Sequence, residues 1–131
     1  MKSPSRGQLL QAIKGFVRVY PLGRPRFNKT TGGVYTPSES QRDLWHELSS
    51  FRAERFALPI IVDCTFYFRE KGPYITSKQL GDIDNLVKAM FDGMVKTGII
   101  EDDSYIVGGE YLKTTCTEDW YEVNIYGAAD V

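Results

Sequence analysis

The chain has few of the side chains that bind soft metals. Its 131 residues include one histidine, His46, and two cysteines, Cys64 and Cys116. Zinc sites in proteins use Cys and His ligands at close spacing, whereas these three residues are far apart in the sequence. A zinc centre is therefore not expected. Both cysteines lie in apolar, strand-like segments, which predicts buried, reduced thiols.

Long hydrophobic segments are also lacking. No run approaches the roughly 20 apolar residues of a membrane-spanning helix, and the N-terminal MKSPSRGQLL has no apolar region of the kind found in secretory signals. We therefore expect a cytoplasmic protein without a membrane partner. Apolar residues make up 42% of the chain, which is enough for a core and argues against wholesale disorder. The length predicts one domain over residues 1–131, with residues 1–8 flexible.

Charge is nearly balanced in total but uneven along the chain. The net charge is −1. Residues 1–57 contain ten Lys and Arg against four Asp and Glu, while residues 58–131 contain six against thirteen. Such asymmetry occurs where a polyanion-binding half adjoins a metal-binding half. Composition alone favours the simpler explanation, a chance segregation of surface charge.

Hydrophobic periodicity predicts four strands. Residues 12–20 alternate between apolar and polar side chains, as in a strand with one buried face. Residues 60–70 are almost continuously apolar, which indicates a strand in the centre of its sheet. Two more strands are expected at 104–115 and 120–127, as an antiparallel pair. Residues 21–37 and 71–81 have the Pro, Gly and Asn content of loops.

Two helices are expected between these strands. The first spans residues 36–56, begins with a capping box of Thr36 and Glu39 around Pro37, and ends before Pro59. The second spans residues 85–97; Asp84 caps it, and Gly98 suits a left-handed stop. The order β-α-β-α-β-β predicts an α+β domain with a mixed sheet of about four strands and two main helices.

Five carboxylates lie at the two ends of the second helix, in GDIDNLVKAMFDGMVKTGIIEDDSYI, residues 81–106. Asp82 and Asp84 precede the helix, and Glu101, Asp102 and Asp103 follow it. Each group alone is ordinary at a helix cap or a turn. A helix of about 13 residues is roughly 20 Å long, and the residues after Gly98 are numerous enough to span that length. Asp103 can therefore lie beside Asp82 and Asp84 in one chain, or the acids can meet across a dimer interface.

Clustered carboxylates favour a divalent cation. Their mutual repulsion raises the cost of ionising them together, and oxygen ligands with little His or Cys indicate Mg²⁺ or Mn²⁺. Such a site can activate a water and stabilise the departing oxygen of a phosphodiester. Lys88 lies four residues after Asp84, on the same helix face, where it can stabilise charge on a phosphate or form an ion pair with Asp84.

The same segment resembles the RusA family of Holliday junction resolvases, common on phages and prophages. The shared pattern is D-x-D-N-x-x-K, an apolar helix with an internal Asp, a Gly turn and D-D. Its residues here are Asp82, Asp84, Asn85, Lys88, Asp92, Gly98, Asp102 and Asp103. The earlier YPLGRPRF and YTP also look like the proline- and arginine-containing loop of many members.

The resemblance implies an Mg²⁺- or Mn²⁺-dependent homodimer that nicks two opposing strands of a four-way DNA junction, in DNA recombination and repair. The family's catalytic acids match Asp82, Asp84 and Asp103, and its catalytic lysine matches Lys88. Asp102 and Asp92 are supporting candidates, and Glu101 matches no position of the motif.

The candidate DNA contacts come from the predicted loops. Phosphate partners are Arg24, Arg26 and Lys29 in the first loop and Lys78 in the second. Phe27 can stack on bases or wedge between them at the junction, or it can anchor the long loop to the core.

Three other functions fit part of the pattern. A different D-x-D enzyme, such as a glycosyltransferase or phosphatase, is possible chemically, but a nucleotide-sugar transferase normally needs a larger domain. A non-catalytic DNA-binding module would not require Asp82, Asp84, Lys88 and Asp103 together. An interaction protein that dimerises through the apolar helix 85–97 is compatible with a nuclease.

Overall fold

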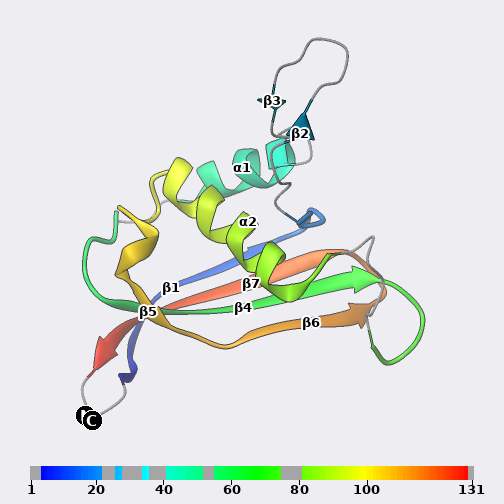
Figure 1. Cartoon of the computed structure of the whole chain (residues 1–131). Coiled ribbons are helices and arrows are strands. Elements are labelled where there is room, and N and C mark those ends of the chain that lie inside the picture. The colour runs from blue at the N-terminus through cyan, green and yellow to red at the C-terminus, as the bar shows by residue number, and fades with distance from the viewer. Residues whose placement is uncertain are drawn as a thin grey trace.

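The computed structural model describes residues 4–21, 26–27, 34–35, 41–51, 55–74 and 81–129. Two helices lie on one face of a curled sheet (Figure 1). The helical elements are α1 (Arg42–Ser49), α2 (Ile83–Lys96) and the short 3₁₀ helix η3 (Asp103–Tyr105). The strands are β1 (Ser5–Gly15), β2 (Arg26–Phe27), β3 (Val34–Tyr35), β4 (Ile60–Arg69), β5 (Ile106–Gly108), β6 (Tyr111–Cys116) and β7 (Trp120–Ala129). This single-domain α+β architecture confirms the predicted fold class.

Strand β4 is central in the mixed sheet, as its apolar sequence predicts. It pairs antiparallel with β7, which in turn pairs antiparallel with β1. On its other side β4 pairs in parallel with β5 near Ile60 and with β6 from Cys64 to Arg69. β5 and β6 thus follow one another along a single edge of the sheet. Strands β2 and β3 pair only with each other in the described part of the chain.

The two last long strands do not pair with each other, so the predicted antiparallel pair is wrong. β6 and β7 lie on opposite sides of β4. The helix α2 connects β4 to the parallel strands β5 and β6, as βαβ crossovers do. The turn after Cys116 then crosses the end of β4, where the Asp119 carboxylate accepts a hydrogen bond from the backbone N–H of Arg69 at 2.7 Å.

The first strand begins earlier and ends earlier than its alternation predicts. β1 covers Ser5–Gly15, so residues 5–8, expected to be flexible, pair with β7. Residues 16–20 follow as irregular chain, although Val19 is still buried in the core. Pairing with β7 overrides the polar composition of the N-terminus because backbone hydrogen bonds form whatever the side chain.

Both predicted helices are present, but their boundaries differ from the predicted ones. α1 begins at Arg42 after Gln41 and ends at Ser49, shorter than residues 36–56. The predicted capping box lies outside the described residues. α2 begins after Asp82, so this residue rather than Asp84 occupies the N-cap position. Gly98, with φ +83°, provides the predicted left-handed stop.

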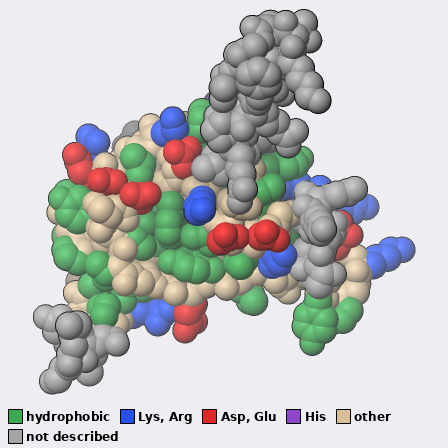
Figure 2. All heavy atoms as spheres, in the orientation of Figure 1, with side chains coloured by type: hydrophobic (Ala, Val, Ile, Leu, Met, Phe, Trp, Pro, Cys, Tyr) green, Lys and Arg blue, Asp and Glu red, His purple; other side chains and the backbone are tan. Residues whose placement is uncertain are grey.

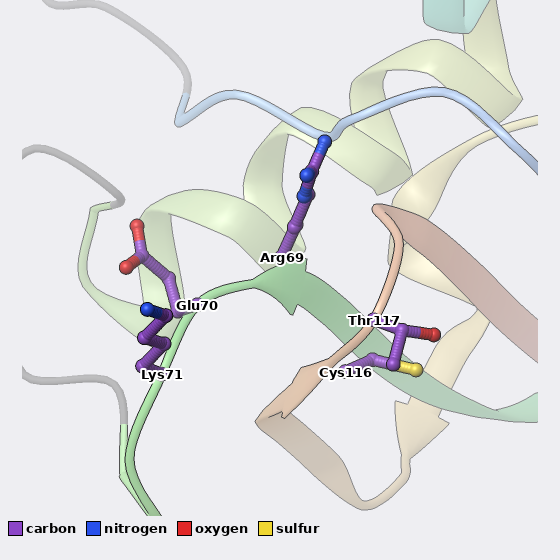
Figure 3. Close-up of a pocket in the computed structure, with 5 residues that line it drawn as sticks. All are labelled: Arg69, Glu70, Lys71, Cys116 and Thr117. Carbon is purple, nitrogen blue, oxygen red and sulfur yellow. The ribbon is translucent and has the colours of Figure 1, made fainter.

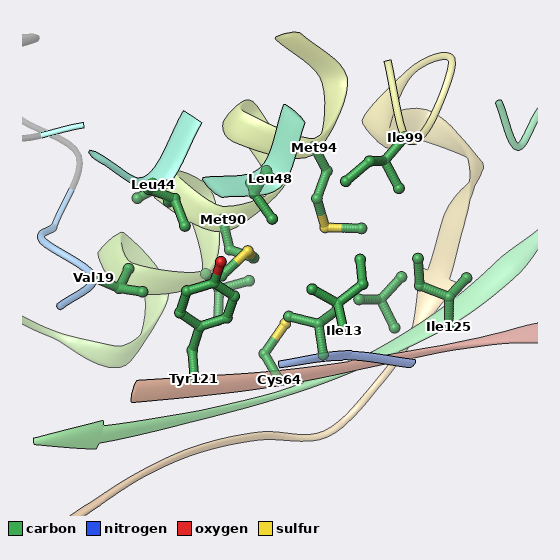
Figure 4. Packing of buried hydrophobic residues seen from close by; sticks show 14 of the residues in the cluster. Ile13, Val19, Leu44, Leu48, Cys64, Met90, Met94, Ile99, Tyr121 and Ile125 are labelled. Atoms are coloured by element: carbon green, nitrogen blue, oxygen red, sulfur yellow. The ribbon is translucent and has the colours of Figure 1, made fainter. Parts of the chain in front are cut away.

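The core lies between the helices and the sheet. Side chains of α2 such as Met90 and Met94 and of α1 such as Leu48 point toward Ile13 and Tyr121 of the sheet (Figure 4). All five are fully buried. Burying a side chain of this size contributes about 1.5–3 kcal/mol. Such packing fixes the axis of α2, and therefore the position of the acids at its ends.

The cysteines are free, and one of them is less buried than predicted. Cys64 of β4 is buried, and this burial raises the pKa of its thiol. Cys116 is half-buried, and its Sγ accepts a hydrogen bond from Trp120 Nε1 at 3.5 Å. Among the residues that the structure describes, no helix is long and apolar enough to cross a membrane.

Candidate functional site

The first two candidate acids lie at the N-terminus of α2. Asp82 is the N-cap residue, and its backbone carbonyl accepts hydrogen bonds from the N–H groups of Asn85 and Leu86, both at 3.1 Å. Its carboxylate makes no capping hydrogen bond within the described chain and is exposed. Asp84, also exposed, accepts a hydrogen bond from Asn85 N–H at 3.0 Å. Both carboxylates point into solvent at the positive end of the helix dipole.

The turn before Asp82 is tightly enclosed. Gly81 is buried and has φ +88°, a left-handed conformation that favours glycine. A Cβ on this residue would lie 2.6 Å from Cβ of Pro21. On the other side, the Gly81 carbonyl accepts a hydrogen bond from Lys113 Nζ at 3.1 Å. The backbone that leads into the acid pair is therefore fixed by contacts from distant parts of the chain.

Lys88 lies one turn after Asp84 and is exposed. The ion pairs of the described residues do not include an Asp84–Lys88 pair within 4.0 Å. Lys88 therefore does not form the i,i+4 salt bridge with Asp84 that is common on helix surfaces. The Lys88 ammonium is available to an anionic group from outside the chain.

The other candidate acids lie beyond the C-terminus of α2. Asp102 is the N-cap of η3, and its carboxylate accepts a hydrogen bond from Ser104 N–H at 3.4 Å. The neighbouring carboxyl groups of Asp102 and Asp103 interact, which lowers the pKa of Asp102 and raises the pKa of Asp103. Desolvation and the negative charges of Asp102 and Asp92 raise the pKa of Asp103 further.

The two groups of acids do not meet within one chain. Asp103 is close enough to Asp92 to be affected by its charge, and Asp92 follows Asp84 by eight residues, or about 12 Å along the helix axis. Among the described residues, no group of three or more His, Cys, Asp or Glu could hold a metal ion. Figure 2 shows the acidic side chains of this face in separate groups with hydrophobic surface between them.

The side chains present fit a hard divalent cation only in part. Carboxylate oxygens are the ligands that Mg²⁺ and Mn²⁺ prefer, and Asp82 and Asp84 offer them without a competing ion pair within 4.0 Å among the described residues. Asp103, the third acid of the pattern, does not join them in a single chain. A complete three-carboxylate site therefore requires a second copy of the chain or a rearrangement of residues 101–105.

The candidate DNA contacts lie mostly where no side chain is described. Arg24, Lys29 and Lys78 are outside the described residues. Arg26 and Phe27 form β2, but the structure describes only their backbone. Their predicted roles remain predictions.

A separate hollow of about 700 Å³ lies at the ends of β4 and β6. It is lined by Arg69, Glu70, Lys71, Cys116 and Thr117. In Figure 3 Arg69 points away from the other labelled side chains, and Glu70 and Lys71 lie apart from Cys116 and Thr117. The described residues of this hollow therefore do not bring a set of polar atoms together around one point, as a small-ligand site does.

Sequence reasoning missed the residues that support the acid pair. Lys113 donates a hydrogen bond to Gly81 and Pro21 packs against it, and the buried Gln41 donates a hydrogen bond to the carbonyl of Pro21 at 3.3 Å. Only the pairing of β6 beside β4 brings Lys113 to this turn, so no local pattern could have identified it. The glycine before Asp82 was the one available signal, because a Gly before a helix often marks a positive φ.

Comparison with known proteins agrees with the motif. The family model described as Endodeoxyribonuclease RusA matches residues 17–126. No curated protein matches the chain. The match includes both helices, all the candidate acids and Lys88. The chain therefore belongs to the RusA family of endodeoxyribonucleases, which act on Holliday junctions.

Proposed function

We propose that this protein is a divalent-metal-dependent endodeoxyribonuclease that resolves four-way DNA junctions by nicking two opposing strands, in DNA recombination and repair. The observation that carries the proposal is the N-terminus of α2. There Asp82 and Asp84 are exposed next to Lys88, and the Asp82 carboxylate is not used to cap the helix in the described chain. These residues lie within the segment matched by the family model.

The proposed roles follow from the side chains. Asp82, Asp84 and Asp103 would hold Mg²⁺ or Mn²⁺, which supplies charge neutralisation at the scissile phosphate. Lys88 donates hydrogen bonds to a phosphate oxygen and offsets the negative charge that develops there. Asp92 and Asp102 surround Asp103 and favour its neutral form in the absence of a cation. An added positive charge reverses that preference.

We infer that the working unit is a homodimer in which each site combines acids from both chains. The two groups of acids lie at opposite ends of α2, with Phe91 and the exposed Tyr111 in edge-to-face contact between them, ring centroids 5.9 Å apart. A two-fold axis near Phe91 would bring the N-terminal acids of one copy beside the C-terminal acids of the other. The same symmetry suits the near two-fold symmetry of a junction and provides two sites for paired nicks.

DNA contact would come from the basic half of the chain. We propose that Arg24, Arg26, Lys29 and Lys78 contact phosphates and that Phe27 stacks on bases at the junction. These cations compensate for the repulsion between the acidic end of α2 and DNA. We also propose a cytoplasmic location, which a DNA substrate supports.

The proposal is tested by nicking of a labelled four-way junction in Mg²⁺. Asp82→Asn keeps the size of the side chain but removes its charge, and we expect nicking to slow at least about 100-fold, because several kcal/mol of charge stabilisation are lost. Glu122→Gln is the matched control, since alternation along β7 places Glu122 on the sheet face opposite the buried Tyr121 and Val123. Equal activity of Asp82→Asn and wild type would sink the assignment.

Two competing functions are less well supported. A non-catalytic DNA-binding module would not need an exposed Asp82, Asp84 and Lys88 at one helix end. A protein that dimerises through the apolar stripe of α2 is disfavoured because Leu86, Met90 and Met94 are already buried against this chain's own core.

A further inference from the structure

Lys113 is a strand lysine whose ammonium group ends at the backbone of the acid-bearing turn. It lies on β6 opposite Phe66 of β4. Paired residues of a parallel ladder share a face of the sheet, and Phe66 is buried in the core beneath the helices. The Lys113 side chain therefore rises on the helix-covered side of the sheet, where Nζ donates a hydrogen bond to the Gly81 carbonyl at 3.1 Å.

The partner of Lys113 is unusual for a partly buried lysine. The ion pairs within 4.0 Å in the described part of the chain involve other residues. A hydrogen bond from a charged donor is stronger than one between neutral groups, so this contact can hold the direction of the carbonyl. Its acceptor is the residue immediately before Asp82.

The opposite side of the same turn is held by a second set of contacts. Gly81 packs on the ring of Pro21 so closely that no Cβ could be accommodated. The carbonyls of Tyr20 and Pro21 accept hydrogen bonds from Gln41 Nε2 at 3.2 and 3.3 Å. Gln41 is only 1% exposed, so this support is part of the interior.

Fixing the Gly81 carbonyl also fixes Asp82. The peptide unit is planar, so the direction of this carbonyl sets the plane that contains the N and Cα atoms of Asp82. The Asp82 carbonyl is in turn held by the N–H groups of Asn85 and Leu86. With both flanking peptides fixed, the Asp82 carboxylate has only its own side-chain torsions left to vary.

We propose that Lys113 is a positioning residue for Asp82, which it orients by anchoring the Gly81–Asp82 peptide against Pro21. The inference rests on the proposed function, in which Asp82 is a metal ligand. Mg²⁺ demands near-ideal octahedral geometry, and groups that orient metal ligands typically change metal affinity 10- to 100-fold when they are removed. Lys113 acts through the backbone and needs no contact with DNA.

The first experiment uses the metal-free protein. In Lys113→Met the amide protons of Asn85 and Leu86, whose acceptor is the Asp82 carbonyl, should exchange with solvent faster than in wild type. Lys113→Arg retains a donor and should restore slow exchange in part. Lys14→Met is the matched control, because Lys14 is an exposed strand lysine on β1, at the other edge of the sheet. Unchanged exchange in Lys113→Met would reject the anchoring role.

The second experiment measures metal and DNA binding separately. By calorimetry, Lys113→Met should bind Mn²⁺ at least about 10-fold more weakly than wild type, with junction affinity in EDTA unchanged. Nicking should show a lower kcat at low Mg²⁺ and recover at high Mg²⁺, with KM for the junction unaltered. A raised KM with normal Mn²⁺ affinity would instead mean that Lys113 contacts DNA, and would overturn the proposal.

Asp82→Asn, measured in parallel, separates this inference from the proposed function. If Asp82→Asn loses Mn²⁺ binding while Lys113→Met retains it, only the positioning role of Lys113 fails. If Asp82→Asn binds Mn²⁺ and nicks junctions like wild type, the proposed function itself fails. Should Lys113→Met not fold, Lys113→Gln carries the same comparison, since its shorter, uncharged side chain cannot replace the Lys113 donor at the Gly81 carbonyl; wild-type Mn²⁺ affinity together with wild-type exchange in that variant would reject the proposal.

Discussion

The two ends of α2 carry the same type of side chain in opposite surroundings. At the N-terminal end the backbone is enclosed, with Gly81 between Pro21 and Lys113, and the Asp82 carboxylate makes no capping bond in the described chain. At the C-terminal end a Cβ on Gly98 would meet nothing within 4 Å, but the acids there already have partners in the chain. Glu101 pairs with Arg55 at 2.7 Å, and the Asp102 carboxylate accepts a hydrogen bond from Ser104 N–H.

This difference separates the roles of the two acid groups. At the N-terminal end, a fixed backbone with carboxylates that form no ion pair among the described residues is suited to holding an external ligand in one geometry. Neighbouring carboxylates that shift each other's pKa are suited to a group whose ionisation follows the arrival of a cation. A complete metal site would combine the acids at the N-terminal end of α2 with the acids that follow its C-terminal end.

The largest expected effect comes from mixing two inactive variants. If each site combines Asp82 of one chain with Asp103 of the other, a mixed dimer of Asp82→Asn and Asp103→Asn has one site with both substitutions and one intact site. After subunit exchange, half of the dimers are mixed, so nicking should return to about a quarter of the wild-type rate. The measurement is junction nicking before and after exchange.

The outcome of that mixture decides where the site lies. Each variant alone should stay inactive, and a mixture of Asp82→Asn with the double variant Asp82→Asn/Asp103→Asn is the control that should not recover. Persistent inactivity of the first mixture, with exchange verified by mass spectrometry, would mean that all three acids come from one chain. Residues 101–105 would then have to move toward Asp82 when DNA or metal binds.

A smaller effect is expected on stability from the two glycines. Gly81→Ala should lower the free energy of unfolding by about 2–4 kcal/mol, because it combines left-handed strain with a collision against the rigid ring of Pro21. Gly98→Ala should cost only about 1–2 kcal/mol, from strain alone. Urea unfolding of both variants measures the difference. Equal losses would show that the turn before Asp82 is no more enclosed than the turn after α2.

The smallest effect is a shift in one pKa. In metal-free protein, Asp102→Ala should lower the pKa of Asp103 toward its ordinary value, because it removes the hydrogen bond and the negative charge that raise it. Because the pKa of Asp103 is higher in the folded state than in the unfolded state, protonated Asp103 stabilises the fold at pH values below its unfolded-state pKa. This stabilisation is lost as the pH rises through the folded-state pKa. Carboxyl NMR titration gives the shift directly. Asp92→Asn should move the Asp103 pKa less, because the charge of Asp92 is a smaller cause of the raised value.

Local patterns were sufficient for part of the fold. The continuous apolar run of residues 60–70 predicted the central strand β4, and the apolar segment 85–97 predicted the helix α2. Gly98 predicted the end of that helix. In each case the sequence pattern and the structural feature that it predicted lie within a few residues of each other, because burial and helix termination are decided locally.

Features set by long-range pairing could not be predicted in this way. Nothing in the sequence of β6 indicates that it pairs in parallel with β4 rather than with β7, which follows after a short turn. The early start of β1 depends on β7, more than one hundred residues away. For the site, the motif indicated Asp82, Asp84 and Lys88 as candidates. Chain length alone allowed Asp103 to lie beside them, whereas the rigid length of α2 keeps Asp103 apart from them.

The hydrogen bond between Lys113 and Gly81 also sets an order of assembly. It joins residues 32 positions apart, and synthesis delivers the chain from its N-terminus. A nascent chain that has emerged only as far as α2 already has Asp82, Asp84 and Lys88, yet it lacks β6 and the contact that orients the first acid. Contacts between distant positions form late in folding. If the proposed function holds, the turn becomes competent to hold a cation only when the sheet edge is complete, and a partly made chain would not cut DNA.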